Sequence, residues 1–449
     1  MPINIPPDAS RILVEAKLKV STGGGGRFQP TGFPDLGPAL YKGADGNDWL
    51  LVESPQSMAN RMERVCWVDG DSETDRVGKY NANCDGIPYV LAIDADSKPL
   101  TASTLEAHRL SSPYIWDTRE FDDPDDKAEG VKAQVTLPEY LKRLFAIGEN
   151  RLVPWKKVAE GLLKVDPGCL LHGIWFNNSA FAGGKVRITR ALSGYIEASS
   201  PSPANYGFQK RDPVSDRTDK EAGQSAAEGF GSVIGPKQHF TSPEIHAYFQ
   251  IDIERLRSYG LNPEQVNALT AWAIYKIRRV LLSSRDGIAD LRTECKFEPA
   301  SVTAKYVHKD TGTKKDYTLP EIGNDLMTAF SSLKGKVLKV KWVPNIEGKV
   351  DLPAGFDEKT LKRVELETKS RFEKSKPKKN SKNAQEKNFF IIFGEWSDSD
   401  KGSLRDQNPE AAVRSLVDKA IKDYEVRWEA KAQSRKPEKD EEEEDRVEQ

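Results

Sequence analysis

Residues 248–298 read YFQIDIERLRSYGLNPEQVNALTAWAIYKIRRVLLSSRDGIADLRTECKFE and contain a full strand–helix–strand pattern. Apolar and polar residues alternate over 248–254, which predicts a half-buried strand. The tetrapeptide NPEQ at 262–265 is typical of a helix start, because it supplies an N-cap, a proline at N1 and a glutamine at N3. Apolar residues then recur at helical spacing as far as Leu281, and alternation over 291–298 predicts a second strand.

A similar pattern lies near the N-terminus. Alternation over residues 11–20 predicts a strand, which runs into the glycines at 23–26. A helix is expected from Ser54, and residues 87–93 (IPYVLAI) are expected to form the next strand. Two β-α-β units in one chain predict an α+β fold with a ferredoxin-like, RRM-type sheet that carries helices on one face. The open face of such a sheet is a common RNA platform.

The predicted helix after Ser54 has two separate stripes. Ser54 is a good N-cap, and a proline follows at the first helical position. Methionines 58 and 62 begin an apolar stripe, whereas Ser57, Asn60, Arg61 and Arg64 form a stripe of hydrogen-bond donors. Together with the free N–H groups of the first turn, these donors predict a site for a polyanion, although an ordinary surface helix would show the same pattern.

A long insertion separates the two units. Residues 140–163 are expected to be helical, and residues 170–176 and 185–198 are expected to pair as strands. Residues 199–235 are rich in Gly, Ser, Pro and charge, which predicts a projecting hairpin or finger. Beyond residue 299 the patterns weaken, and we expect strands at 337–343 and 389–393, a basic linker near residue 380 and a helix over 408–428.

The net charge of −2 conceals segregated charges. Residues 438–449 carry eight acids and two bases, or −6, so the rest of the chain carries −2 − (−6) = +4. Within it, residues 359–387 carry eleven bases and four acids, or +7. Such segregation is compatible with nucleic-acid binding, and the acidic tail is expected to be disordered.

The chain lacks the motifs of several enzyme classes. It contains no HExxH, GxSxG or Walker sequence and no GxGxxG after a strand, so we expect no catalytic residue, no cofactor and no metal site. Four widely spaced cysteines indicate a reducing compartment, and no apolar run is long enough to span a membrane, so a cytoplasmic location is expected. An RNA endonuclease is the enzymatic alternative, with His172 or His108 as its base.

Basic and aromatic residues favour nucleic-acid binding. Cations could contact phosphates while aromatic rings stack on bases. A general single-stranded nucleic-acid-binding protein would show the same features. The predicted RNA-binding residues are Lys17, Lys19, Arg27, Phe28, Gln29, Ser54, Gln56, Ser57, Asn60, Arg61, Arg64, His108, Arg109, Tyr114, His172, Arg187, Arg190, Phe208, Lys210, Arg211 and Phe230.

Eight ordered strings between residues 26 and 299 resemble a known family. They are GRFQPTGFPDLGPALY, LLVESPQSMANRMERV, HRLSSPYI, LLHGIWF, RITRALSGYIEA, GFGSVIGPKQHFTSPEIHAYFQIDIERLRSYGL, AWAIYKIRRVLL and LRTECKFEP. The chain resembles the Csb-one, or Cas-seven-type, backbone subunit of the type I-G (formerly I-U) CRISPR Cascade complex, within the RAMP superfamily.

The resemblance implies a non-enzymatic subunit. Copies of it would stack along the CRISPR RNA (crRNA) and present the guide for pairing with target DNA. Its other partners would be the remaining Cascade subunits, namely a large subunit and a fused Cas-five/Cas-six-type subunit, with no membrane partner. The implied division is an RRM-like palm (1–100 and 240–300), a finger or helical insertion (101–198) and a thumb hairpin or loop (199–239). A C-terminal extension (300–436) and a disordered acidic tail (437–449) would follow.

Overall fold

The structure is a computed structural model. The structure describes residues 5–341 except 34–36, 73–74, 95, 117–120, 126–133, 149–150, 177–180, 182–185 and 211–232. All of these residues belong to one compact unit, Met1–Trp342. The predicted basic linker, the strand at 389–393, the helix at 408–428 and the acidic tail lie outside the described residues.

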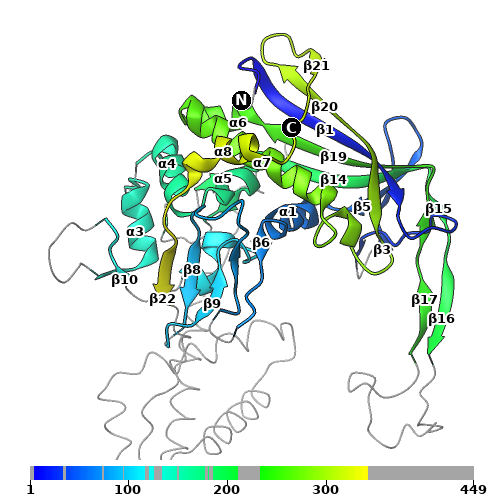
Figure 1. Ribbon diagram of the computed structural model, residues 1–449, viewed down its shortest axis with the longest axis horizontal. Helices are drawn as coiled ribbons and strands as arrows, with labels where there is room; N and C mark the ends of the chain where they lie inside the picture. Colours follow the sequence, from blue (N-terminus) through cyan, green and yellow to red (C-terminus); the bar gives the residue numbers. More distant parts are fainter. Residues whose placement is uncertain are drawn as a thin grey trace, which may run out of the picture. The chain divides into compact units, whose positions relative to one another are not determined.

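The largest sheet among the described residues is a seven-stranded antiparallel sheet (Figure 1). Every pairing in it, from one edge strand to the other, is antiparallel. In spatial order its strands are β21 (Lys314–Asp316), β20 (Phe297–His308), β1 (Ala9–Val20), β19 (Glu244–Asp252), β14 (Leu192–Ser199), β5 (Asp48–Glu53) and β4 (Leu40–Lys42).

Two helices cover one face of the sheet. Alternation along β1 turns Ile12, Val14 and Ala16 inward, where all three are fully or almost fully buried. Helix α1 (Pro55–Arg64) packs on β14, and α7 (Pro263–Leu282) packs on β19 and β20 (Figure 1). The approach of α1 requires a glycine at 194, because a Cβ there would lie 2.4 Å from the Phe249 ring and 3.1 Å from Met58.

The chain crosses the sheet twice by way of these helices. It runs from β1 through α1 to β14, returns along β19 after residues 200–243, and crosses again through α7 to β20. The four central strands therefore stand in the order β20-β1-β19-β14. The chain is a mixed α+β protein with an antiparallel sheet, as its alternating and helical patterns predict.

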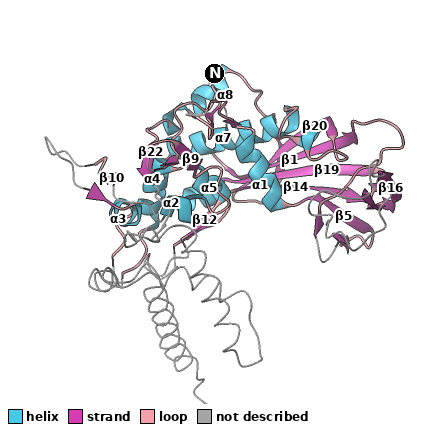
Figure 2. Cartoon of the chain, turned by 90° about the horizontal axis from the view of Figure 1, so that it is seen from below, coloured by secondary structure: helices cyan, strands magenta, loops and turns pink. Residues whose placement is uncertain are grey.

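Smaller elements surround the large sheet (Figure 2). A three-stranded sheet contains β22 (Leu338–Lys341), β8 (Val90–Ile93) and β9 (Pro99–Ala102). Short two-stranded ribbons are β2–β3 (Gly32–Phe33, Gly37–Pro38), β6–β7 (Trp67–Val68, Lys79–Tyr80), β10–β11 (Phe121–Asp122, Gln134–Val135), β12–β13 (Ile174–Trp175, Arg187–Ile188), β15–β18 (Ser202–Pro203, Phe240–Thr241) and β16–β17 (Tyr206–Lys210, Val233–Lys237). The remaining helical segments are η1 (Arg109–Ser111), α2 (Pro113–Trp116), α3 (Leu137–Leu144), α4 (Trp155–Val165), α5 (Gly168–His172), α6 (Ile253–Ser258), η5 (Ile288–Asp290), α8 (Asn324–Ala329) and η6 (Ser331–Leu333).

Several predicted elements are confirmed. Strand β1 includes residues 11–20, and β22 lies within the predicted strand 337–343. Helix α7 begins after Asn262, whose side chain accepts a hydrogen bond from Gln265 N. The Gln265 side chain in turn accepts a hydrogen bond from Asn262 N, which completes the expected capping box. None of the described helices is long and apolar enough to cross a membrane.

Other predicted elements are wrong in detail. The strand at 87–93 shortens to β8, which pairs with β22 in the small sheet, while the position after α1 in the large sheet belongs to β14. Residues 168–172 form α5, so only Ile174–Trp175 remain for pairing with β13. The predicted helix at 140–163 divides into α3 and α4.

The strand predicted over residues 291–298 also starts later than its alternation predicts. Strand β20 begins at Phe297, whereas Arg292 and Cys295 form only an isolated bridge. It continues to His308, so the large sheet extends past residue 300, at which the sequence-based division ends the palm.

Candidate nucleic-acid interface

Helix α1 has the cap and the two stripes expected from its sequence. The Ser54 side chain accepts a hydrogen bond from Ser57 N at 3.2 Å, and Pro55 occupies the first helical position. Met58 and Met62 are fully buried beneath the helix. The buried methionines turn the opposite face of α1, which carries the hydrogen-bond donors, toward the surface.

The donors near the middle of α1 are already paired. Glu53 is fully buried, and its carboxylate lies 3.0 Å from Arg61 Nε and 2.9 Å from Arg292 Nη2. Ser57 donates its hydroxyl proton to the same carboxylate, and Arg61 also donates to the carbonyl oxygens of Asp290 and Leu291. A buried carboxylate needs such partners, so Arg61 and Ser57 hold the fold together and are not the free polyanion donors that the sequence predicts.

Arg64, at the C-terminal end of α1, is also paired. It hydrogen-bonds Asp69 and lies 3.7 Å from Asp286, while Asp69 also binds Arg285. Arginines and aspartates therefore alternate at this end of the helix, which presents no purely cationic surface.

The N-terminal end of α1 brings together three predicted residues. Arg190 donates to the Pro55 carbonyl at 3.2 Å and to Gln56 Oε1 at 2.9 Å. Gln56 in turn donates to Asn60 Oδ1 at 3.3 Å. Gln56 and Asn60 are exposed, so this end of α1 presents a small polar surface beside a guanidinium.

A tryptophan that was not predicted from the sequence is exposed on β12. Trp175 on β12 is 56% exposed and stands opposite the exposed Arg187 on β13. The Ser111 hydroxyl donates to the Trp175 carbonyl at 2.9 Å, which holds η1 next to β12. The exposed His108 and Tyr114 flank η1, so this surface combines aromatic and cationic groups.

The hairpin of β16 and β17 carries a second such surface. Tyr206, Phe208 and Lys210 alternate along one face of β16, and the register places Lys237 opposite Tyr206. The Arg27 guanidinium lies 5.0 Å from the centre of the Tyr206 ring, and Lys237 Nζ lies 5.5 Å from that of Phe208. We call Arg27, Tyr206, Phe208 and Lys237 the hairpin ladder.

Glu294 fixes the base of the hairpin ladder. Its carboxylate accepts a hydrogen bond from the Tyr206 hydroxyl at 2.9 Å and lies 2.6 Å from His239 Nε2 and 3.7 Å from Lys237 Nζ. The Tyr206 and His239 rings meet edge to face, with centroids 5.0 Å apart. The ladder is therefore held in position before any ligand binds.

Three predicted contacts lie in the interior, which corrects their assignment to the surface. Phe28 is fully buried and packs edge to face on Phe297. Arg109 is 7% exposed and pairs with Glu63. His172 is 2% exposed, and burial together with nearby cations holds its pKa well below the usual value. Because bases and phosphates cannot reach these groups, their roles in this structure are in packing and ion pairing.

The remaining predicted residues are divided between surfaces. Lys17 and Lys19 are exposed on the face of the large sheet opposite α1, and Lys17 pairs with Glu244 at 3.1 Å. Gln29 is half-buried, with its N–H bonded to the Glu294 carbonyl at 2.8 Å. Lys210 is exposed at the end of β16, and Arg211 and Phe230 lie outside the described residues.

The buried carboxyl group of Asp166 predicts a pH dependence of stability. Burial, reinforced by Glu63, raises the pKa of Asp166 from 3.8 to about 6, although Ser103, Arg109 and Lys276 act in the opposite direction. Since the folded state holds this proton more tightly than the unfolded chain, ionisation of Asp166 removes stability as the pH rises from about 4 to 6.

Ionisation of Asp166 is therefore expected to lower the unfolding free energy of the wild type by about 3 kcal/mol between pH 4 and pH 7. The Asp166→Asn variant is expected not to show this decrease. Urea unfolding of both proteins at the two pH values measures this difference. An equal pH dependence in the variant and the wild type would contradict the assignment.

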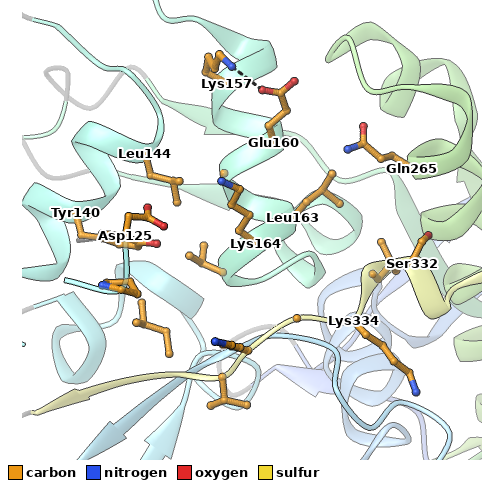
Figure 3. Close-up of a pocket in the computed structure, with 18 of the residues that line it drawn as sticks. Asp125, Tyr140, Leu144, Lys157, Glu160, Leu163, Lys164, Gln265, Ser332 and Lys334 are labelled. Atoms are coloured by element: carbon orange, nitrogen blue, oxygen red, sulfur yellow. Dashed lines mark hydrogen bonds and ion pairs between the residues drawn. The ribbon is translucent and has the colours of Figure 1, made fainter. Parts of the chain in front are cut away.

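A pocket of about 890 Å³ lies apart from these surfaces (Figure 3). Lys157 and Glu160 in its wall form an ion pair at 3.0 Å. It contains none of the predicted RNA-binding residues. Its wall includes both signs of charge, from Lys157, Lys164, Lys334 and Lys336 and from Asp125, Glu160 and Glu264, and this mixture favours no one ligand charge.

Three residues of these surfaces were not predicted from the sequence, namely Trp175, Tyr206 and Lys237. Tyr206 and Phe208 are two residues apart, which is the spacing of one strand face, but their segment is rich in Gly, Ser and Pro. Lys237 joins them only through cross-strand pairing. Such a surface depends on register, which a single sequence does not specify.

One family model matches part of the chain. Residues 12–201 match the sequence model of a family described as CRISPR-associated protein GSU0053. No curated protein matches the chain.

Three solved structures are similar in part. A subunit of a structure titled "CRISPR RNA-guided surveillance complex, pre-nicking" has 11% identity and a TM-score of 0.33, covering 66% of this chain and 78% of its own. A subunit of a structure titled "CRISPR RNA-guided surveillance complex" has 10% identity and a TM-score of 0.29, covering 91% and 99%. Csc2 from Thermofilum pendens has 9% identity and a TM-score of 0.24, covering 73% and 72%.

Proposed function

We propose that this chain is a guide-RNA-binding backbone subunit of a type I-G CRISPR Cascade complex, of the Csb-one or Cas-seven type. The match of residues 12–201 to a CRISPR-associated family supports the setting. The observation that carries RNA binding is the hairpin ladder, in which two aromatic rings on one face of β16 each lie close to a cation from a neighbouring segment. The subunit binds and positions RNA and performs no chemistry itself.

The proposal includes a ferredoxin-like, RRM-type palm. In that fold two β-α-β units interlock so that the strand order is 4-1-3-2. The order β20-β1-β19-β14, with α1 and α7 as the crossing helices, supports this identification. The hairpin of β16 and β17, which joins β14 to β19 in the chain, then takes the place of a thumb.

The chemistry of the ladder suits a guide whose sequence varies. Aromatic rings stack on any base, and cations contact phosphates regardless of sequence. Sequence recognition is then left to pairing between the guide and target DNA. The exposed Trp175 beside Arg187 offers a second stacking position for the bases of the same RNA strand. Partners of this subunit would be the crRNA, further copies of the chain and the other Cascade subunits.

The RNA that accompanies the chain tests this function. We expect the protein, purified from cells with its neighbouring operon, to retain short RNAs of uniform length with one repeat-derived end. Random RNA fragments would instead favour a general single-stranded nucleic-acid-binding protein. Specific cleavage of added RNA would favour the endonuclease alternative.

The same RNAs test the ladder directly. The double variant Tyr206→Ala/Phe208→Ala is expected to bind them about 30-fold more weakly, because each lost stacking contact costs about 1 kcal/mol. Trp155→Ala, which removes an exposed ring at the start of α4, is the matched control and is expected to bind normally. Fluorescence anisotropy measures both affinities, and equal binding by the double variant would remove the ladder from the interface.

A further inference from the structure

The large sheet has a second face that faces away from α1 and α7. Outward residues of β1, β14 and β19 alternate with the core residues, and every one of them is half-buried or exposed. The described part of the chain therefore leaves this face uncovered. It shares no residue with the hairpin ladder.

Aromatic rings run across the middle of this face. The register places Tyr195 on β14 directly opposite Tyr248 on β19, with ring centroids 5.4 Å apart. The His246 ring stacks next to Tyr248, with centroids 5.9 Å apart and an interplanar angle of 14°. At the sheet edge, Tyr41 is 42% exposed and donates its hydroxyl proton to Glu197 at 2.6 Å.

Carboxylates surround the rings. Glu15 lies opposite Tyr248 and contacts His246 Nδ1 at 2.8 Å, and Glu197 lies opposite His246. Glu244 pairs with Lys17 at 3.1 Å. Burial, followed by the charges of Glu15 and Glu197, raises the pKa of Tyr248 to about 12, in agreement with carboxylates that converge on its ring.

The charge of this surface selects its ligand. Among the described residues, neither Glu15 nor Glu197 forms an ion pair with a lysine or arginine. Phosphates near the rings would meet these carboxylates directly, and Lys17 on the same face is already paired with Glu244. The region around the rings therefore disfavours nucleic acid, although it has the open-sheet position at which RRM-type proteins bind RNA. A cation, in contrast, finds both carboxylates and ring faces within one surface.

We propose that this outer tyrosine face, formed by Glu15, Tyr41, Tyr195, Glu197, His246 and Tyr248, docks an arginine-bearing segment of a partner protein. A guanidinium can stack on a tyrosine ring while its planar fork pairs with a carboxylate. Lysine offers a point charge without that fork, so arginine is the preferred residue. The subunit then binds RNA through one surface and a basic protein segment through another.

Fluorescence anisotropy with a labelled arginine–glycine repeat peptide and the full chain tests the proposal. The double variant Glu15→Gln/Glu197→Gln keeps side-chain size and is expected to bind the peptide about tenfold more weakly than the wild type. The lysine–glycine counterpart should bind the wild type more weakly than the arginine peptide. The acidic residues at 438–449 are present in every variant, so their contribution cancels in the comparison.

Two controls define the outcomes. Asp71→Asn removes an exposed acid outside the face and should bind the peptide as the wild type does. The affinity of the double variant for single-stranded RNA should stay unchanged. Unchanged peptide binding in the double variant, or a change in RNA binding, would overturn the proposal.

Cross-linking of the wild-type protein gives an answer even where a variant fails to fold. The same arginine peptide carrying a benzophenone group is expected to cross-link to residues 195–197 or 246–248, as located by mass spectrometry. Cross-links confined to other segments would reject the outer tyrosine face as the docking surface.

Discussion

The Arg109→Met variant is expected to lose about 3 to 5 kcal/mol of unfolding free energy, because it leaves a buried carboxylate without its partner. Arg109 Nε lies 2.8 Å from Glu63 Oε1, and Nη2 lies 2.7 Å from Glu63 Oε2. Both residues are less than one-tenth exposed. The third donor, Nη1, reaches the Gly173 carbonyl at 3.3 Å, so the guanidinium joins α1 to the segment after α5.

Urea denaturation measures this loss. The double variant Glu63→Leu/Arg109→Met removes both charges and is expected to recover much of the stability, since a buried ion pair costs desolvation that apolar residues do not. An Arg109→Met protein with normal stability but weakened RNA binding would restore the surface role that the sequence predicts for Arg109.

The Glu53→Gln variant is expected to lose about 2 to 3 kcal/mol of unfolding free energy, because it weakens charge-assisted hydrogen bonds to two arginines. Glu53 is fully buried, whereas the Arg61 and Arg292 side chains retain 18% and 27% exposure. Water can therefore partly solvate the two released guanidinium groups, which makes the cost smaller than for Arg109. Chemical denaturation of the variant gives the value.

An ion pair with an exposed carboxylate provides the control for Glu53. Glu321 is 78% exposed and pairs with Arg278, so Glu321→Gln should cost less than about 1 kcal/mol. Hydrogen exchange should also show faster exchange of α1 amides in Glu53→Gln, because Glu53 ties β5 and α1 to the segment before β20. Equal costs in the two variants would contradict this role of Glu53.

Local signals in the sequence predicted the elements that local interactions form. The alternation of β1 and the caps of α1 and α7 arise from neighbouring residues, and the structure contains all three. The pairing of the strands could not be predicted in the same way. Strands β8 and β14 both contain apolar residues, and only packing decides which of them joins the large sheet.

The candidate site shows the same limit. Charge and helical spacing identified Arg61 as a surface donor, but its partner Glu53 lies on a neighbouring element, and Arg292 approaches from far along the chain. The sequence alone does not distinguish an arginine that pairs with a buried carboxylate from an arginine that is free to bind RNA. The outer tyrosine face also exists only after β1, β14 and β19 align.

The position of β1 has a consequence for biosynthesis. β1 lies between β19 and β20, so neither of its edges can pair until residues 244–252 and 297–308 have been made. About 280 residues separate the end of β1 from the start of β20, which corresponds to roughly 15 to 55 s of translation. Both edges of this twelve-residue amphipathic segment stay open until β19 has been made, and one edge stays open until β20 follows. Open strand edges are templates for aggregation. Slower translation therefore lengthens the period for which the edges of β1 stay open.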